Sequence, residues 1–267
     1  MKRVKIVLAC LLALCVVLPS FVSASALDEI QDRGVLRVGM EPGYMPFEMT
    51  NQKGEIIGFD VDMAKGIAKA MGVKLELVNT AWDGIIPALL TKKYDMIMSG
   101  MTITQERNLK VNFALPYIVI GQTILIKKEI AEDVQFYRDL NNKKYKVGSK
   151  LGTTGEKATK RLIPNCTYIS FDTEAEGITD LVNGKIDAFV YDLPYMEIAY
   201  KQKSEGKLVY LDKPFTYEPL GWAVRRGDFD FINWLNNYMI QIRSDGTYNK
   251  IYAKWIQSDA WLQQIQK

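Results

Sequence analysis

The strongest constraint on the fold is a regular alternation of short apolar segments with amphipathic ones. Residues 35–39 and 74–78 predict strands, and the segment between them predicts a helix that ends near Gly72. The apolar residues of that helix recur on one face: Phe59, Met63, Ile67 and Ala70. A helix over 84–91 and a strand over 95–99 follow. Strands that alternate with helices of this length predict βαβ units on a mostly parallel sheet.

The same pattern restarts in the second half of the chain. Strands are predicted at 145–148, 167–171 and 186–191, and helices lie between them and after Pro194. Two such series predict two lobes, each with its own sheet.

Two extended segments, 121–126 and 220–224, stand before and after the second series. The simplest topology has the chain leave a first lobe, build a second one and return. We therefore expect an α/β protein of two lobes, each a mostly parallel sheet flanked by helices, joined by two hinge strands with a cleft between them. The expected divisions are a leader at 1–26, the first lobe at 27–122, the second lobe at 123–218, and a return to the first lobe at 219–267.

The first 26 residues have the pattern of a secretory signal peptide. Three basic residues and no acid precede an apolar run from Ile6 to Leu18, and small residues with the spacing Ala24-x-Ala26 close the segment. We expect cleavage after Ala26, with cleavage after Ala24 as the alternative. The run is too short for a permanent membrane anchor, which needs about 20 residues.

Cysteine, histidine and charge argue against several classes of function. Cys10 and Cys15 lie in the leader, so Cys166 has no partner for an intramolecular disulfide. A lipid anchor on Cys10 is disfavoured, because the apolar core before it is too short for a signal. The chain has no histidine, which excludes His-dependent triads and most transition-metal sites. Without the leader, basic and acidic residues are equal in number, so nothing indicates a nucleic-acid partner.

In open α/β sheets, ligands bind beyond the carboxyl ends of the strands. That rule selects four segments of this chain: 40–44, 99–107, 152–156 and 191–192. In the second of them Gly100 exposes backbone N–H groups, Thr102 offers a hydroxyl, and Arg107 offers a planar donor that fits a carboxylate. The alternative is a surface helix whose arginine is merely solvated.

The other segments are also open to two interpretations. Residues 152–156 lack the ending of a phosphate loop, and Thr153 with Glu156 fits a capping box, although the same N–H groups and hydroxyls would also hold an acid. Asp192 either caps the following helix or receives a cation. The aromatic residues in the loops after strands either stack on a ligand or fill the core: Tyr44 and Trp82.

Several motifs taken together resemble one family. They follow one another over nearly the whole chain after the leader: 35–39 (VLRVG), 46–48 (PFE), 58–62 (GFDVD), 82–89 (WDGIIPAL), 99–107 (SGMTITQER), 152–154 (GTT), 187–192 (DAFVYD) and 245–248 (DGTY). These motifs resemble the family-3 solute-binding proteins of polar amino-acid ABC importers. The resemblance implies a type II periplasmic binding protein whose two lobes close over the ligand.

The resemblance also implies roles for individual residues. Arg107 would clamp the α-carboxylate of an amino acid, helped by Thr102 and by the backbone at Gly100 and Thr154. Asp192 would receive the α-ammonium. The other residues expected at the ligand are Tyr44 and Trp82 as an aromatic wall, Glu41 at the ligand side chain, and the neighbouring Ser99, Met101 and Thr153.

We therefore expect a periplasmic, monomeric binding protein that delivers a free amino acid to an inner-membrane ABC permease, without cofactor, metal or catalysis. Glu41 beside Tyr44 and Trp82 suits a cationic side chain. Glutamine or another polar amino acid is the alternative, and charge repulsion by Glu41 disfavours an acidic ligand.

Two other functions are known for relatives of this fold. A secreted cyclohexadienyl or arogenate dehydratase would need an added general acid, for which Glu41 is the one candidate in the sequence. A sensor module would need a membrane helix or a second domain after the lobes, whereas this chain ends at Lys267 after a short tail. We rank both functions below the binding protein.

Overall fold

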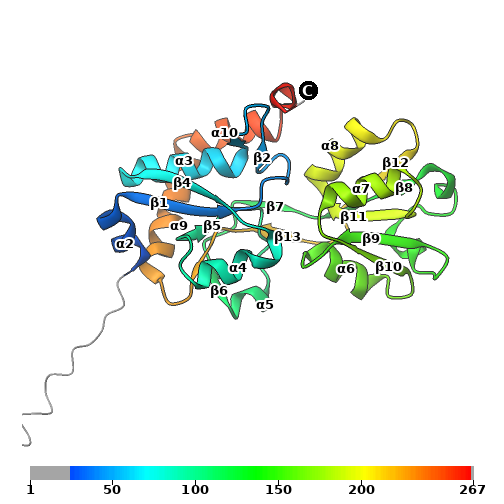
Figure 1. Ribbon diagram of the computed structural model, residues 1–267, viewed down its shortest axis with the longest axis horizontal. Helices are drawn as coiled ribbons and strands as arrows, with labels where there is room; N and C mark the ends of the chain where they lie inside the picture. The colour runs from blue at the N-terminus through cyan, green and yellow to red at the C-terminus, as the bar shows by residue number, and fades with distance from the viewer. Residues whose placement is uncertain (1–24, 266–267) are drawn as a thin grey trace, which may run out of the picture.

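The computed structural model describes residues 25–265 of the chain. Two lobes lie side by side and are joined by a narrow waist (Figure 1). The expected leader lies outside the described residues, except for Ser25 and Ala26. Within residues 25–265, no helix has the length and apolar character needed to cross a membrane.

The first lobe is built around a five-stranded sheet that uses both halves of the chain. In spatial order its strands are β4 (Lys74–Asn79), β1 (Val35–Met40), β5 (Met96–Ile97), β14 (Ala223–Arg225) and β6 (Val111–Phe113). β4, β1 and β5 are parallel, whereas β14 runs antiparallel to β5 and β6. A small antiparallel pair, β2 (Met49–Thr50) and β3 (Ile56–Ile57), stands beside the sheet.

Helices cover both faces of this sheet; Figure 1 shows α3 on one side and α4 on the other. The helices of this lobe are α2 (Ala26–Arg33), α3 (Phe59–Met71), α4 (Trp82–Leu90), α5 (Gln105–Asn108), α9 (Phe229–Ser244), α10 (Thr247–Trp255) and the 3-10 helix η3 (Ala260–Gln264). The predicted helices are present, and α4 begins two residues earlier than expected, at Trp82.

The helix α3 shows how well the apolar pattern predicted the buried face. Phe59, Met63 and Ile67 are fully buried, as expected, and Gly72 ends the helix in the left-handed conformation. The prediction for Ala70 is wrong, because Ala70 is exposed. The buried stripe continues instead at Met71, which stands four residues after Ile67.

The second lobe repeats the plan with the sheet order β10 (Thr167–Phe171), β9 (Lys146–Lys150), β11 (Ala188–Asp192), β8 (Gln122–Lys127) and β12 (Leu208–Leu211). β10, β9 and β11 are parallel, and β8 is antiparallel to both of its neighbours. The helices are α6 (Thr154–Leu162), α7 (Glu174–Val182), α8 (Leu193–Lys203) and the 3-10 turns η1 (Lys128–Ile130) and η2 (Tyr137–Leu140).

The waist consists of two short antiparallel strands, β7 (Ile118–Ile120) and β13 (Glu218–Leu220). Two crossing strands are therefore present as predicted, but β7 lies just before the expected segment 121–126, and β13 reaches only the first residue of the expected segment 220–224. The expected segments instead form β8 and β14, which belong to the two main sheets. Each crossing strand is separated from the following sheet strand by only one or two residues, so the apolar pattern alone does not mark where the chain crosses.

Candidate functional site

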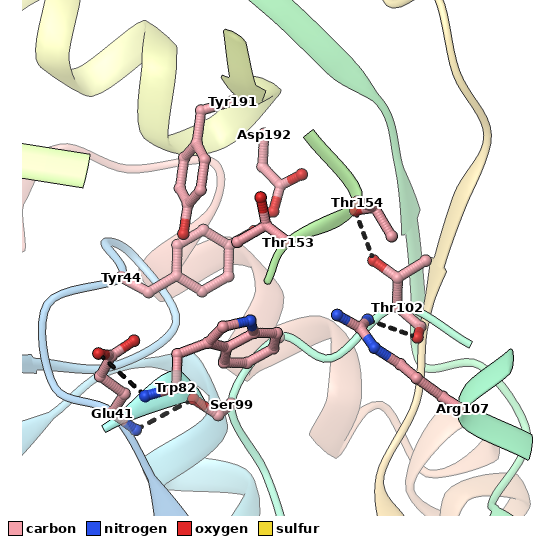
Figure 2. Close-up of a pocket in the computed structure, with 11 residues that line it drawn as sticks. Glu41, Tyr44, Trp82, Ser99, Thr102, Arg107, Thr153, Thr154, Tyr191 and Asp192 are labelled. Carbon is pink, nitrogen blue, oxygen red and sulfur yellow. Dashed lines mark hydrogen bonds between the residues drawn. The ribbon is translucent and has the colours of Figure 1, made fainter. Parts of the chain in front are cut away.

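A small cavity lies between the two lobes, beyond the carboxyl ends of strands from both sheets. Its volume is about 20 Å³, so side chains of the two lobes nearly meet across it. The lining residues are Glu41, Tyr44, Trp82, Ser99, Gly100, Thr102 and Arg107 from the first lobe and Thr153, Thr154, Tyr191 and Asp192 from the second (Figure 2). Every site residue expected from the sequence lines this cavity, with the exception of Met101.

Strand ends place these side chains. Glu41 follows β1, Trp82 opens α4 after β4, and Ser99 follows β5. In the second lobe Thr154 opens α6 after β9, and Asp192 is the last residue of β11. The rule that ligands bind beyond the carboxyl ends of strands therefore selected segments that do meet in space.

Arg107 is buried in the cleft, with 7% of its surface exposed. Its Nη1 donates a hydrogen bond of 2.8 Å to the carbonyl of Thr102, and its guanidinium lies over the ring of Trp82, 5.2 Å from the centroid. Burial lowers the pKa of Arg107, and the nearby carboxylates of Glu218 and Asp192 oppose that shift. Arg107 is thus a buried cation in the first turn of α5, and its remaining N–H groups are suited to an anion.

Asp192 occupies the N-cap position of α8, but within the described chain its side chain makes no capping hydrogen bond. Its carboxylate instead accepts a hydrogen bond of 2.5 Å from the hydroxyl of Tyr44, across the cleft, and another from Nε2 of Gln122. Burial raises the pKa of Asp192 to about 7. Gln122 was not expected at the site; it stands beside Asp192 because the two are paired between β8 and β11.

Tyr44 forms one wall of the cavity. Its ring stacks on Phe47 at 4.9 Å between centroids and meets the ring of Tyr191 edge-on at 5.7 Å. Gly100 lies directly against the ring: a Cβ at this position would come within 2.1 Å of Tyr44 Cε1. A glycine is therefore needed here for close approach, and also because its φ is +53°.

The floor of the site rests on two buried carboxyl groups that were not expected. Ser99 Oγ donates to Glu48 Oε1 at 2.6 Å and accepts a hydrogen bond from the Glu41 backbone N–H. The Gly100 N–H donates to Asp60 Oδ2 at 2.9 Å. Burial raises the pKa of Asp60 to about 7 and that of Glu48 well above its usual value. These two acids position the segment that follows β5.

Hydrogen bonds join the lobes at the edge of the cavity, and one of them, of 3.4 Å, runs from Arg107 Nη2 to the Gly152 carbonyl. Trp82 Nε1 donates to the Gly152 carbonyl at 3.1 Å, and the hydroxyls of Thr102 and Thr154 lie 3.4 Å apart. Only half of the predicted capping box is formed, because Thr153 Oγ1 accepts from the Glu156 N–H while the Glu156 carboxylate accepts from the Gly152 N–H.

A buried lysine lies at the Glu41 end of the site. Lys150 Nζ is 2.8 Å from Glu174 Oε2 and also pairs with Glu41 Oε2. Burial by itself lowers the pKa of Lys150, but the carboxylates of Glu174 and Glu41 more than reverse this and leave the pKa raised. Sequence reasoning missed both Lys150 and Glu174. Lys150 could have been found, because it is the last residue of β9 and the carboxyl-end rule applies to it.

Met101 differs from the expectation. Its side chain packs in an apolar cluster with Ile85, Leu89 and Ile97, and its carbonyl accepts a hydrogen bond from Gly221. Its neighbours Gly100 and Thr102 line the cavity, and the left-handed backbone at Gly100 lies between Ser99, which also lines it, and Met101. Among residues 25–265, no group of three His, Cys, Asp or Glu side chains could hold a metal ion.

Comparison with known proteins agrees with this geometry. The sequence model of the bacterial extracellular solute-binding proteins, family 3, matches residues 36–258. The L-cystine-binding protein of Escherichia coli K12 is 31% identical over 241 residues, which cover 90% of this chain and 89% of that protein.

Two solved structures are closer in sequence. A putative binding component of an ABC transporter from Wolinella succinogenes, complexed with lysine, is 53% identical with a TM-score of 0.84, and the match covers 86% of this chain and 99% of that one. An ancestral amino acid-binding protein, described as a precursor of cyclohexadienyl dehydratase, is 47% identical with a TM-score of 0.81 over 87% of this chain and 99% of its own. Since the family match runs from β1 to beyond α10 and includes every residue of the cavity, the chain belongs to the bacterial extracellular solute-binding proteins of family 3.

Proposed function

We propose that this protein is the periplasmic binding component of an ABC importer and that it captures a free α-amino acid between its lobes. Its family membership supports this, as do relatives that are named for binding amino acids or for serving an ABC transporter. The periplasmic location rests on the leader pattern of the first 26 residues. The protein would act as a monomer and deliver its ligand to an inner-membrane permease.

The observation that carries the proposal is a pair of buried, oppositely charged side chains at one cavity, Arg107 from the first lobe and Asp192 from the second. An α-amino acid carries one carboxylate and one ammonium. Arg107 would bind the carboxylate with two parallel hydrogen bonds, beside the hydroxyls of Thr102 and Thr154. Asp192 would accept hydrogen bonds from the ammonium. Because the ligand meets both partners only when the lobes are together, binding stabilises the closed form.

The side chain of the ligand would point toward Glu41. Figure 2 shows Glu41 and Arg107 on opposite sides of Trp82, so the cavity has a head-group end and a side-chain end. A carboxylate beside the rings of Trp82 and Tyr44 favours a cationic side chain such as that of lysine or arginine. The Wolinella relative was solved with lysine, whereas the E. coli relative is named for cystine. Family membership therefore supports a polar amino acid, and the cationic preference rests on Glu41.

A dehydratase is the second candidate, favoured by the ancestral relative described as a precursor of cyclohexadienyl dehydratase and by the buried carboxyl group of Asp192 in the cavity. A buried acid whose pKa is about 7 is able to donate a proton at neutral pH. We favour binding without catalysis because Glu41, the acid that the sequence offered for this role, is held in an ion pair with Lys150. Incubation with prephenate or arogenate, followed by assay for phenylpyruvate or phenylalanine, tests this choice; turnover of either compound would contradict it.

The binding proposal is tested by thermal melting and calorimetry of the exported protein with each of the twenty amino acids. A ligand at 100 times its Kd stabilises the folded state by about 2.7 kcal/mol, which raises the melting temperature by roughly 5–10 °C in a chain of this size. We expect the largest rise with lysine or arginine. A rise with aspartate or glutamate alone would contradict the role of Glu41, and the absence of any rise would contradict the function.

A further inference from the structure

The side-chain end of the site holds three charged groups, which we call the distal ion cluster: Glu41, Lys150 and Glu174. Lys150 Nζ lies between the two carboxylates and contacts both. The exposed fractions of the side chains are 3% for Lys150, 4% for Glu174 and 20% for Glu41. Charges this deeply buried are costly unless they are paired, so each group depends on the others.

The distal ion cluster spans the cleft. Lys150 ends β9 and Glu174 begins α7, both in the second lobe, whereas Glu41 follows β1 in the first lobe. One ion pair is thus internal to the second lobe and the other joins the two lobes. When the lobes part, Lys150 keeps its ion pair with Glu174 and loses its ion pair with Glu41. Glu41 then keeps the hydrogen bond that its Oε1 accepts from the Trp82 N–H at 3.2 Å, because Trp82 belongs to the same lobe.

We propose that Lys150 is a specificity-determining residue whose ammonium occupies the position beside Glu41 that the cationic side chain of a ligand would take. This proposal rests on the amino-acid-binding function proposed above. A cationic ligand must displace Lys150 from Glu41, and Glu174 retains the displaced ammonium in the second lobe. A ligand with a neutral polar side chain leaves the Lys150–Glu41 pair in place. Lys150 therefore weakens the preference for cations that Glu41 creates.

The net charge of the distal ion cluster predicts whether each substitution raises or lowers the preference for a cationic ligand. Two carboxylates and one ammonium leave one net negative charge. Lys150→Met makes this two negative charges, whereas Glu174→Gln makes the cluster neutral. The double variant restores one net negative charge. The first change should favour a cationic ligand, the second should disfavour it, and the double variant should lie near the wild type.

The experiment is calorimetry of the exported protein with arginine as the cationic probe and glutamine as the neutral one. We expect Lys150→Met to strengthen arginine binding by about tenfold and Glu174→Gln to weaken it by a similar factor, which lies within the roughly 5–150-fold range of coupling between two binding sites. The ratio of the two Kd values is the readout, because a general effect on lobe closure changes both ligands alike. The double variant should return this ratio to within about threefold of the wild type.

Lys157→Met is the matched control. Lys157 also pairs across the cleft, with Glu106, but both side chains are exposed, at 46% and 63%. The same substitution there should leave the arginine-to-glutamine ratio unchanged, because exposed ion pairs contribute little.

Two results would overturn the proposal: an unchanged ratio in both single variants, or a shift in the same direction in both. Circular dichroism checks folding, since Lys150→Met leaves the buried carboxylate of Glu174 and the partly exposed one of Glu41 without their ammonium. If that variant does not fold, Glu174→Gln and the double variant decide the question by the same ratio of Kd values.

If the wild-type protein binds none of the twenty amino acids, the proposed function itself fails. That result is distinguishable from intact binding with an unchanged ratio of Kd values, which would contradict only the role of Lys150.

Discussion

Asp192 shows that the role of a single residue depends on its partners in space. Aspartate is a favoured N-cap, and Asp192 stands at the N-cap position of α8. A capping side chain binds the N–H of the second or third helical residue, and here the second is Pro194, which has no N–H. The carboxylate turns instead to Tyr44 and Gln122. Both contacts come from segments far away in the sequence, so the sequence left both the cap and the receptor open.

The pKa of Asp192 predicts how amino-acid binding depends on pH. The α-ammonium of a ligand needs the ionised carboxylate, whereas below pH 7 the ligand-free protein holds Asp192 protonated, since its pKa is about 7. Each pH unit below that value should therefore weaken binding by about tenfold. Calorimetry from pH 8 to pH 5 with one amino acid checks this, and Asp192→Asn should bind weakly with little dependence on pH.

The raised pKa of Asp192 weakens ligand binding at low pH, but it makes the ligand-free protein more stable at low pH. The folded pKa of about 7 lies above the ordinary value of 3.8, so the protonated group contributes stability that is complete below pH 4 and is lost as the pH rises through 7. Binding should for this reason be followed by Kd rather than by melting temperature alone. A Kd that is constant between pH 5 and pH 8 would contradict the assignment of Asp192 to the ammonium.

Gly100 gives a second prediction at the scale of one residue. Gly100→Ala should lower the free energy of unfolding by about 2–4 kcal/mol, because it combines a left-handed backbone with a clash against the Tyr44 ring. It should also weaken amino-acid binding, since Tyr44 is displaced from Asp192. The control is Gly54→Ala, where φ is +80° and no described atom lies within 4 Å of the added Cβ. The control should cost only about 1–2 kcal/mol, and equal losses in the two variants would show that the ring contact is unimportant.

At the scale of elements, the start of α2 is joined to the start of α9 by one carboxylate. Asp228 accepts hydrogen bonds from Ser25 Oγ at 2.6 Å and from the Ala26 N–H at 2.7 Å, and it also caps α9 through the N–H of Phe231. Ser25 in turn caps α2, accepting from the N–H of Leu27. Cleavage after Ala26 would remove the first two residues of this arrangement, whereas cleavage after Ala24 would keep them.

For the export proposed above, we predict from this arrangement that cleavage follows Ala24 and leaves Ser25 as the first residue, in place of the cleavage after Ala26 expected from the sequence. A chain that begins at Leu27 should be less stable by about 1–3 kcal/mol, because it loses a helix cap and two hydrogen bonds. Urea unfolding of the two chains measures the difference, and mass spectrometry of the exported protein gives its first residue. Asp228→Ala should cost less in the chain that begins at Leu27 than in the chain that begins at Ser25. Equal stability of the two chains would contradict the prediction.

At the scale of the whole molecule, the two lobes carry opposite halves of the proposed head-group site. Arg107 belongs to the first lobe and Asp192 to the second. Arg107→Ala and Asp192→Ala should each abolish amino-acid binding, with a loss of at least about 2–5 kcal/mol, because each leaves one charged end of the ligand unpaired. Calorimetry measures the binding, and small-angle scattering should show no compaction on addition of the amino acid.

The control for this pair is Arg138→Ala, since Arg138 lies in the second lobe and contacts Tyr137 rather than the cavity. The Arg138→Ala variant should bind the amino acid with wild-type affinity and should show the same compaction as the wild-type protein. All three variants should keep the circular dichroism of the folded protein. Wild-type affinity in either Arg107→Ala or Asp192→Ala would show that the head-group assignment is wrong.

Some features of this protein were predictable because they are local. The periods of apolar residues gave the order and type of the helices and strands, and the rule on strand ends selected the segments that line the cavity. The predictions that differ from the structure concern features that depend on contacts between segments distant in the sequence. Met101 lies within a correctly chosen segment but points away from the cavity, and the crossing strands lie a few residues before the expected positions, because strand pairing rather than composition decides both.

The sequence by itself determined the two-lobed α/β architecture and the head-group residues Arg107 and Asp192 as candidates, since these follow from periodicity and from chemistry at strand ends. Only the tertiary structure decided that both are buried at one cavity and that Glu41 is paired with a lysine. Lys150 and Glu174 stand 24 residues apart, and Glu41 is 109 residues from Lys150. Contacts over such separations leave no trace in a local pattern, yet they set the net charge at the Glu41 end of the cavity.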